Sequence, residues 1–313
     1  MSDAVDVHVH LYPDRDAARW SLATYDVAEY GPKNGVDFAN ASGLVEEVAA
    51  LCGDDGPLRH AVVVNLFARD LFYERAVAAL DPAAPEGERA KASRTIEAGL
   101  GEAMLQFNEW LLNSVATHSG LTAFVAVDPT VLTPAENIAQ LFRMADQGAR
   151  GVKLHPVLQR FQPDDPRMDE VYETCVELDL TVLSHSGANA GTRQYARPGA
   201  FAPVLRAHPR LRLVLAHLGG GAWHEAAAFA EAFPDVSFDL SEIIEWLGAA
   251  GAPNRADFVQ LIRRIGADRV MLGSDYPWYD PLATLSKVGD LPGLSAGEKE
   301  AIIGGNARRI LGI

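Results

Sequence analysis

Short, nearly continuous runs of apolar residues recur along the chain and are separated by longer segments of mixed polarity. An uninterrupted apolar run of this length is typical of a parallel strand that is buried on both faces. Eight such runs are present, at residues 4–9, 60–66, 121–127, 150–155, 180–185, 211–217, 236–241 and 269–275. We therefore expect eight β-strands in a sheet that is covered on both sides.

The segments between these runs have the three-to-four-residue periodicity of amphipathic helices. Two of them open with capping-box patterns, Thr133 with Glu136 and Ser295 with Glu298. Strands that alternate with helices form parallel βαβ units, and eight units close into a (β/α)8 TIM barrel. We expect one such domain over residues 1–313, with helices at 38–51, 95–119, 133–148, 167–179, 198–208, 224–233, 254–266 and 295–312.

Two connections are longer than a typical loop between a strand and a helix, residues 10–37 and 67–95. Each follows a strand, so each should lie at the C-terminal face of the barrel. Substrate loops and lids are built at that face.

Composition and charge narrow the class of partner. The chain has 313 residues, of which 48% are hydrophobic and 22% charged, as in an ordinary globular protein. Its net charge of −15 argues against nucleic acid and against a membrane surface as partners. No apolar run is long enough to span a bilayer. A small molecule is the partner that we expect.

The two cysteines, Cys52 and Cys175, form no CxxC pair. Free thiols are typical of proteins in a reducing compartment. The N-terminal residues also lack the features of a secretory signal. We therefore expect a cytoplasmic protein.

Histidines gather where the predicted strands end. His8, His10, His155, His185 and His217 all occupy such positions. The C-terminal ends of barrel strands converge around one axis, so these side chains should meet there.

The first strand carries a His-x-His motif. Alternate residues of a strand share a face, so Asp6, His8 and His10 should point the same way. Two imidazoles on one inward face make half of a metal site, and Asp275 at the last strand end adds a carboxylate. The alternative interpretation is a set of buried polar residues that are satisfied by hydrogen bonds.

The ordered motifs HxH, GVKLHP, HSG, AHLGG, GSDYP and GNARRIL resemble the amidohydrolase superfamily. More narrowly, they resemble its amidohydrolase 2 branch, the aminocarboxymuconate-semialdehyde decarboxylase-like enzymes. The resemblance runs from residue 6 to the end of the chain. It implies a TIM barrel with a divalent metal ion. It does not select a substrate, because the branch contains hydrolases, hydratases and non-oxidative decarboxylases.

The resemblance also implies roles for individual residues. His8, His10, His185 and Asp275 would be the metal ligands. Asp275 would also accept a proton from the attacking water, and His217 would be the acid/base that polarises the substrate. Imidazole and carboxylate ligands suit zinc, and manganese is the alternative.

The fourth strand leaves two alternatives open. Binuclear members of the superfamily carry a carboxylated lysine on this strand, and Lys153 could be that residue. His185 and His217 would then hold a second ion. In the one-metal alternative, which we expect, Lys153 is a substrate-anion anchor or a buried structural cation. His155 contacts the substrate or a metal ligand, or it is a capping residue before Pro156. Arg193 and Trp278 are further substrate-side candidates.

Our leading hypothesis is a metal-dependent hydrolase in which activated water attacks an ester, lactone or amide carbonyl of a small molecule. The alternative is a non-oxidative decarboxylase that acts on an unsaturated or aromatic carboxylic acid at the same site. A catalytically silent barrel is a third hypothesis, which the complete ligand set disfavours. The resemblance also makes a homodimer plausible.

Overall fold

A computed structural model describes residues 3–24, 42–189 and 194–313, and its centre is a parallel barrel. Eight strands pair in sequence order. Backbone hydrogen bonds from Val7 N to Leu272 O (2.9 Å) and from His10 N to Tyr276 O (2.7 Å) join the last strand region to the first. The predicted TIM barrel is confirmed. The strands are β1 (Val5–Val9), β2 (His60–Val64), β3 (Leu121–Ala126), β4 (Gly151–Leu154), β5 (Thr181–Ser184), β6 (Leu213–Leu215), β7 (Ser237–Asp239) and β8 (Val270–Met271).

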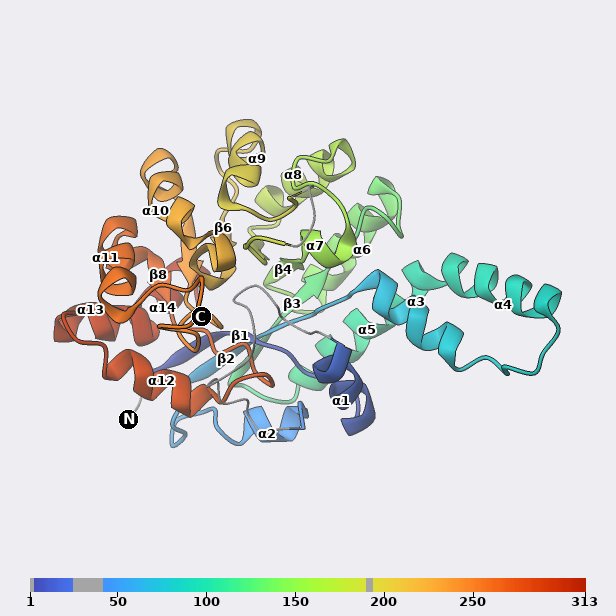
Figure 1. The fold of residues 1–313 in the computed structure, drawn as a ribbon, viewed down its shortest axis with the longest axis horizontal. Helices are drawn as coiled ribbons and strands as arrows, with labels where there is room; N and C mark the ends of the chain where they lie inside the picture. Colours follow the sequence, from blue (N-terminus) through green and yellow to red (C-terminus); the bar gives the residue numbers. More distant parts are fainter. Residues whose placement is uncertain (1–2, 25–41, 190–193) are drawn as a thin grey trace.

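Helices surround the strands (Figure 1). None of the described helices is both long and apolar enough to cross a membrane. The α-helices are α1 (Arg15–Thr24), α2 (Val45–Ala49), α3 (Arg69–Ala78), α4 (Glu86–Ala98), α5 (Leu100–Val115), α6 (Pro134–Asp146), α7 (Pro156–Gln159), α8 (Asp169–Glu177), α9 (Ala202–Ala207), α10 (Trp223–Ala232), α11 (Arg255–Ile265), α12 (Pro281–Gly289), α13 (Ala296–Glu300) and α14 (Asn306–Leu311).

The long connection at 67–95 is not an irregular loop. It contains α3 and most of α4, which project from the barrel as a helical arm (Figure 1). Neither helix has a buried residue. Their Ala, Glu, Lys and Arg residues favour helix through intrinsic propensity, without the apolar periodicity of a packed helix. The connection at 10–37 contains α1, and residues 25–37 lie outside the described part of the chain.

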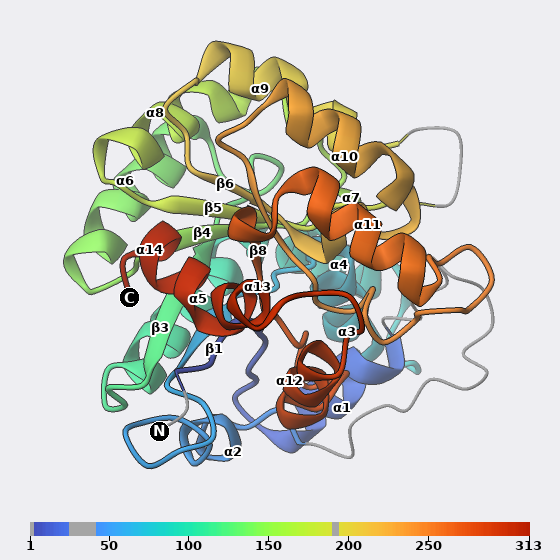
Figure 2. The ribbon, with the colours of Figure 1, turned by 90° about the vertical axis from the view of Figure 1, so that its left-hand side faces the viewer.

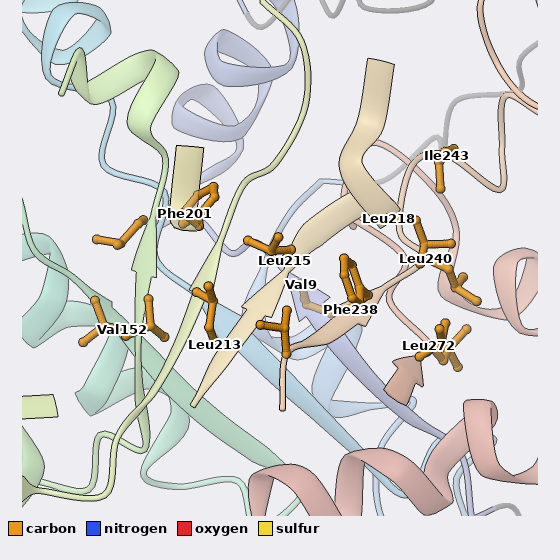
Figure 3. Close-up of a cluster of buried hydrophobic side chains, with 14 of the residues drawn as sticks. Val9, Val152, Phe201, Leu213, Leu215, Leu218, Phe238, Leu240, Ile243 and Leu272 are labelled. Carbon is orange, nitrogen blue, oxygen red and sulfur yellow. The ribbon is translucent and has the colours of Figure 1, made fainter. Parts of the chain in front are cut away.

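Apolar side chains fill two layers. The outer layer lies between the strands and the helices, and Figure 3 shows Leu215, Phe238 and Leu272 in it. The inner layer fills the barrel with residues such as Val7 and Met271. Leu311 of α14 joins this inner layer, and α14 lies across the N-terminal ends of the strands (Figure 2). The barrel is therefore plugged at one end, and its polar side chains gather at the other.

A register shift in β1 sets which residues face inward. The pairing of β1 with β2 shifts between Asp6 and Val9. Val7 belongs to the inner layer, whereas Val9 belongs to the outer one. The expectation that Asp6 shares the face of His8 is therefore wrong, because the bulge breaks the alternation. Asp6 instead braces the backbone, since its Oδ1 accepts the N–H groups of His8 (3.1 Å) and Ser274 (3.0 Å).

Candidate metal centre

Three of the predicted ligands meet at the C-terminal end of the barrel. Asp275 Oδ1 lies 3.1 Å from His10 Nε2 and 3.5 Å from His8 Nε2. His8 lies in β1 and His10 directly follows it, and Asp275 follows β8, the neighbour of β1 in the barrel. Asp275 has a left-handed backbone (φ 63°), and its N–H donates to His8 O at 2.8 Å. Closure of the barrel therefore places the carboxylate against both imidazoles.

The hydrogen bonds of His10 fix which of its ring nitrogens carries the proton. Its Nδ1 lies 3.0 Å from the carbonyl oxygen of Val64, the last residue of β2. A carbonyl can only accept, so Nδ1 must donate. Burial lowers the pKa of His10 to about 4, which keeps the ring neutral at physiological pH. The Nε2 lone pair therefore faces Asp275.

His8 is held in the same tautomer by a different partner. Its Nδ1 lies 3.0 Å from Asp239 Oδ2 and 3.0 Å from Ser241 Oγ. Its Nε2 lies 2.8 Å from Lys153 Nζ. An ammonium group only donates, so the His8 Nε2 lone pair accepts from Lys153. Lys153 and a metal ion would compete for that lone pair.

The two carboxylates of the site are held in the ionised form. Burial alone would raise the pKa of Asp275, but His8 and His10 outweigh it and lower that pKa well below its usual range. The same balance lowers the pKa of Asp239, where His8 is again the main favourable neighbour. Burial lowers the pKa of Lys153 to about 8 although three carboxylates oppose the shift. The centre thus combines two ionised carboxylates with a buried lysine.

His217 lies beside this cluster, directly after β6. Its backbone is left-handed (φ 61°), and its N–H donates to Asp239 Oδ1 at 3.1 Å. Its Nδ1 lies 3.1 Å from the carbonyl oxygen of Ser241 and so carries the proton. Burial, with a contribution from His185, lowers the pKa of His217 to about 3. Glu242, also left-handed (φ 60°), brings its Oε2 to 3.8 Å from His217 Nδ1. Strained backbone of this kind concentrates at functional sites.

His155 and His185, which directly follow β4 and β5, form a second arrangement. The rings of His155 and His185 stack with their centroids 4.0 Å apart and their planes at 7°. His185 also meets the ring of His217 edge-on, at a centroid distance of 5.0 Å. Three described groups of potential ligands bring their donor atoms within 4.8 Å of one another, and His185 belongs to none of them. Its role as a metal ligand stays a prediction.

The predicted substrate-side residues fall in different places. Lys153 is inside the centre, next to His8. Trp278 meets the ring of His10 edge-on, at a centroid distance of 5.4 Å. His155 caps α7, where its Nδ1 accepts the N–H of Leu158 at 3.4 Å. Arg193 lies outside the described residues.

Sequence reasoning missed Asp239. Asp239 accepts hydrogen bonds at both of its oxygens and is completely buried. A signal was present, because the acid interrupts the apolar run 236–241 two residues before Ser241. Two polar residues at a spacing of two indicate a polar inward face at the end of a strand.

The cluster of His8, His10 and Asp275 fits a divalent metal ion. His10 Nε2 and Asp275 Oδ1 are both acceptors, yet they lie only 3.1 Å apart. Two acceptors at that distance repel each other unless a cation lies between them. Imidazole nitrogen and carboxylate oxygen are common ligands for zinc and manganese. By contrast, both histidines of the group His8, His217 and Asp239 carry the proton on Nδ1, and Asp239 accepts from His8 Nδ1 and from the His217 backbone N–H, so hydrogen bonds hold that group together.

The sequence matches the model of the family described as Amidohydrolase, the amidohydrolase 2 branch, over residues 5–313. The chain belongs to this amidohydrolase family. The predicted resemblance is confirmed. The protein is a metal-dependent enzyme of the amidohydrolase superfamily. A comparison with curated proteins gave no match.

Solved structures share the fold of this amidohydrolase at low sequence identity. An uncharacterised TIM-barrel protein from Bordetella bronchiseptica has a TM-score of 0.70 at 20% identity, with 99% of this chain and 98% of that chain covered. A dihydroxybenzoic acid decarboxylase from a Polaromonas species, with bound manganese and the inhibitor 2-nitroresorcinol, has a TM-score of 0.66 at 14% identity, covering 100% and 97%. A putative 2-pyrone-4,6-dicarboxylic acid hydrolase from Pseudomonas putida has a TM-score of 0.57 at 20% identity, covering 99% and 97%.

Proposed function

We propose that this amidohydrolase is a hydrolase of small esters, lactones or amides, and that it uses one divalent ion, zinc, at the cluster of His8, His10 and Asp275. The observation that carries the proposal is the ionised Asp275 carboxylate, 3.1 Å from His10 Nε2 and 3.5 Å from His8 Nε2. His185 completes the proposed ligand set. A divalent ion bound there lowers the pKa of a water molecule, so that hydroxide is available at neutral pH.

The residues of the chain divide the remaining work. Asp275 accepts the proton of the attacking water, which an ionised carboxylate next to that water can do. His217 is the proposed acid/base, and its Nε2 lone pair would take up a proton before the ring could donate to the substrate oxygen. Because its Nδ1 donates to the Ser241 carbonyl, only its Nε2 is available for the substrate. Trp278 packs edge-on against the ring of His10.

A second candidate is the non-oxidative decarboxylation of an aromatic or unsaturated acid, and the position of Lys153 favours it. The ammonium group of Lys153 is buried beside His8, where it could hold a substrate carboxylate. The relatives of known fold include both a decarboxylase and a putative hydrolase. The two reactions differ in whether water is consumed.

Labelled solvent separates the two reactions. The zinc-loaded protein is incubated in H₂¹⁸O with 4-nitrophenyl acetate, δ-valerolactone and 2,6-dihydroxybenzoate, and the products are followed by mass spectrometry. The hydrolase proposal predicts one ¹⁸O in the acid released from the ester or the lactone. Asp275→Asn should lower this rate at least about 100-fold, because it removes a general base. Loss of CO₂ from the benzoate, with no turnover of ester or lactone, would overturn the proposal in favour of the decarboxylase.

A further inference from the structure

A pair of residues at the end of β7 contacts both His8 and His217. Ser241 Oγ lies 3.0 Å from His8 Nδ1 and 2.9 Å from His217 Nδ1. The same hydroxyl donates its single proton to Asp239 Oδ1. Both of its contacts to the imidazoles must therefore be ones in which Ser241 accepts and the histidine donates.

Asp239 accepts at both ends of its carboxylate. Its Oδ1 receives the backbone N–H of His217 (3.1 Å) and of Ser241 (3.0 Å), in addition to the Ser241 hydroxyl. Its Oδ2 receives the Nδ1–H of His8 at 3.0 Å. Every neighbour that these contacts define is a donor, so the position requires an acceptor at each oxygen.

We infer that Asp239 and Ser241 are positioning residues, which hold His8 and His217 together in the Nδ1–H tautomer and so direct both Nε2 lone pairs to the reaction centre. The inference rests on the proposed metal centre, because His8 is one of its ligands. A carboxylate that accepts from the outer nitrogen of a ligating histidine fixes its ring and makes it a better ligand. Here Asp239 and Ser241 together would position both a metal ligand, His8, and the acid/base, His217.

The inference makes an unusual prediction for Asp239→Asn. Asparagine has nearly the same shape as aspartate, but one of its two ends donates. Three donors converge on the Oδ1 position, so the amide oxygen should settle there. The amide N–H₂ then faces His8 Nδ1 and forces the proton to Nε2, which blocks metal binding. Asp239→Ala removes the acceptor without imposing the wrong tautomer.

The test compares Asp239→Asn, Asp239→Ala and Ser241→Ala with Ser237→Ala. Ser237 lies two residues before Asp239 on the same strand and is also buried. Zinc affinity is measured by competition with a chromogenic chelator. Histidine tautomers are read from ¹⁵N chemical shifts and two-bond couplings in the chelated protein, where no substrate is needed.

We expect Asp239→Asn to weaken zinc binding about 10- to 100-fold and to move the proton of His8 to Nε2. Asp239→Ala should weaken binding less, and Ser241→Ala should free His217 to mix its tautomers. Ser237→Ala should match the wild type. A merely structural role predicts the reverse order, with the isosteric asparagine milder than alanine, and that order would overturn the inference.

Failure of the inference and failure of the proposed function can be told apart. If the wild type binds no zinc, the proposed metal centre is wrong, yet the chelated-state spectra still show whether Asp239 sets the tautomers. If the wild type binds zinc and Asp239→Asn leaves both affinity and tautomers unchanged, the positioning role is wrong and the centre stands. Should Asp239→Asn fail to fold, Asp239→Ala and Ser241→Ala carry the same tautomer readout.

Discussion

The β1 half and the β4 half of this barrel end differ in how a histidine ring is anchored. On the β1 side, His8 and His10 donate from Nδ1 to Asp239 and to the Val64 carbonyl. On the β4 side, His155 accepts at Nδ1 from the backbone N–H of Leu158. Nδ1 is therefore a hydrogen-bond donor in the β1 half and an acceptor in the β4 half.

This difference assigns different chemistry to the two halves. A neutral ring with Nδ1–H presents an Nε2 lone pair, which can bind a metal ion. A neutral ring that accepts at Nδ1 presents Nε2–H, which can donate to a substrate oxygen but cannot bind a metal. Burial, with the nearby His185, lowers the pKa of His155 well below its usual range, so that ring is also neutral. The sequence motif alone does not distinguish these histidines.

The largest effect should come from the half that presents lone pairs. His10→Ala removes one of the Nε2 atoms beside Asp275, and we expect zinc affinity to fall by more than about 100-fold, beyond the usual cost of losing an outer partner. Metal content per chain, measured by mass spectrometry after dialysis against zinc, checks this. Far-ultraviolet circular dichroism should be unchanged, and retention of one tightly bound zinc in a folded variant would exclude His10 as a ligand.

Lys153 lies in β4 but contacts the β1 half, because its ammonium group donates to His8 Nε2. Lys153→Met removes both a competitor for that lone pair and a positive charge next to the ion. We expect zinc to bind about 10-fold more tightly, since a hydrogen bond to a charged group contributes about 1.5 kcal/mol or more.

A binuclear centre bridged by a carboxylated Lys153 predicts the opposite sign, with loss of metal in Lys153→Met. Metal content near one ion per chain in the wild type would support a mononuclear centre, and two ions per chain would contradict it. Lys153→Arg keeps the charge and is the matched control for Lys153→Met.

A smaller effect is expected from the half that presents an N–H. His155→Ala should leave zinc content unchanged and lower kcat/KM about fivefold, the value of one ordinary hydrogen bond. His155→Asn should recover part of this loss, because its side chain can cap α7 and still donate. Steady-state kinetics with the ester substrate checks both variants. Loss of zinc in His155→Ala would place His155 among the ligands and remove the distinction between the halves.

The fold could be predicted because its signal is local and repeated. Each buried strand is an apolar run, and their number and alternation with helices specify the barrel. The helical arm of α3 and α4 could not be predicted from apolar periodicity, because none of its residues is fully buried. Its sequence favours a helix through intrinsic propensity rather than through apolar periodicity.

The site could be predicted in part, because barrel topology brings strand ends together whatever their separation in sequence. That rule placed His8, His10 and Asp275 in one cluster. The tautomers could not be predicted, since they depend on acceptors such as the Val64 carbonyl, which lies 54 residues from His10. The bulge in β1 was also invisible, because a register shift changes hydrogen bonding without changing the apolar pattern.

Asp128 extends the comparison from histidines to carboxylates at strand ends. Like Asp275 it follows a strand, but its Oδ2 has no hydrogen-bond partner among the described residues. Burial raises the pKa of Asp128 to about 6, although Thr130 opposes the shift. Because this pKa is raised above the unfolded value, the stabilisation is present at low pH and is lost as the pH rises through about 6.

Asp128→Asn should therefore remove a pH dependence rather than a contact, since the amide can still accept from the Thr130 N–H. Between pH 5 and pH 7 the wild type should lose about 1 kcal/mol of unfolding free energy relative to the variant. Urea unfolding of both proteins at the two pH values measures this difference, and titrations elsewhere in the chain cancel in it. If the two proteins keep a constant difference, Asp128 is already ionised at pH 5, and its environment resembles that of Asp275 more than its contacts indicate.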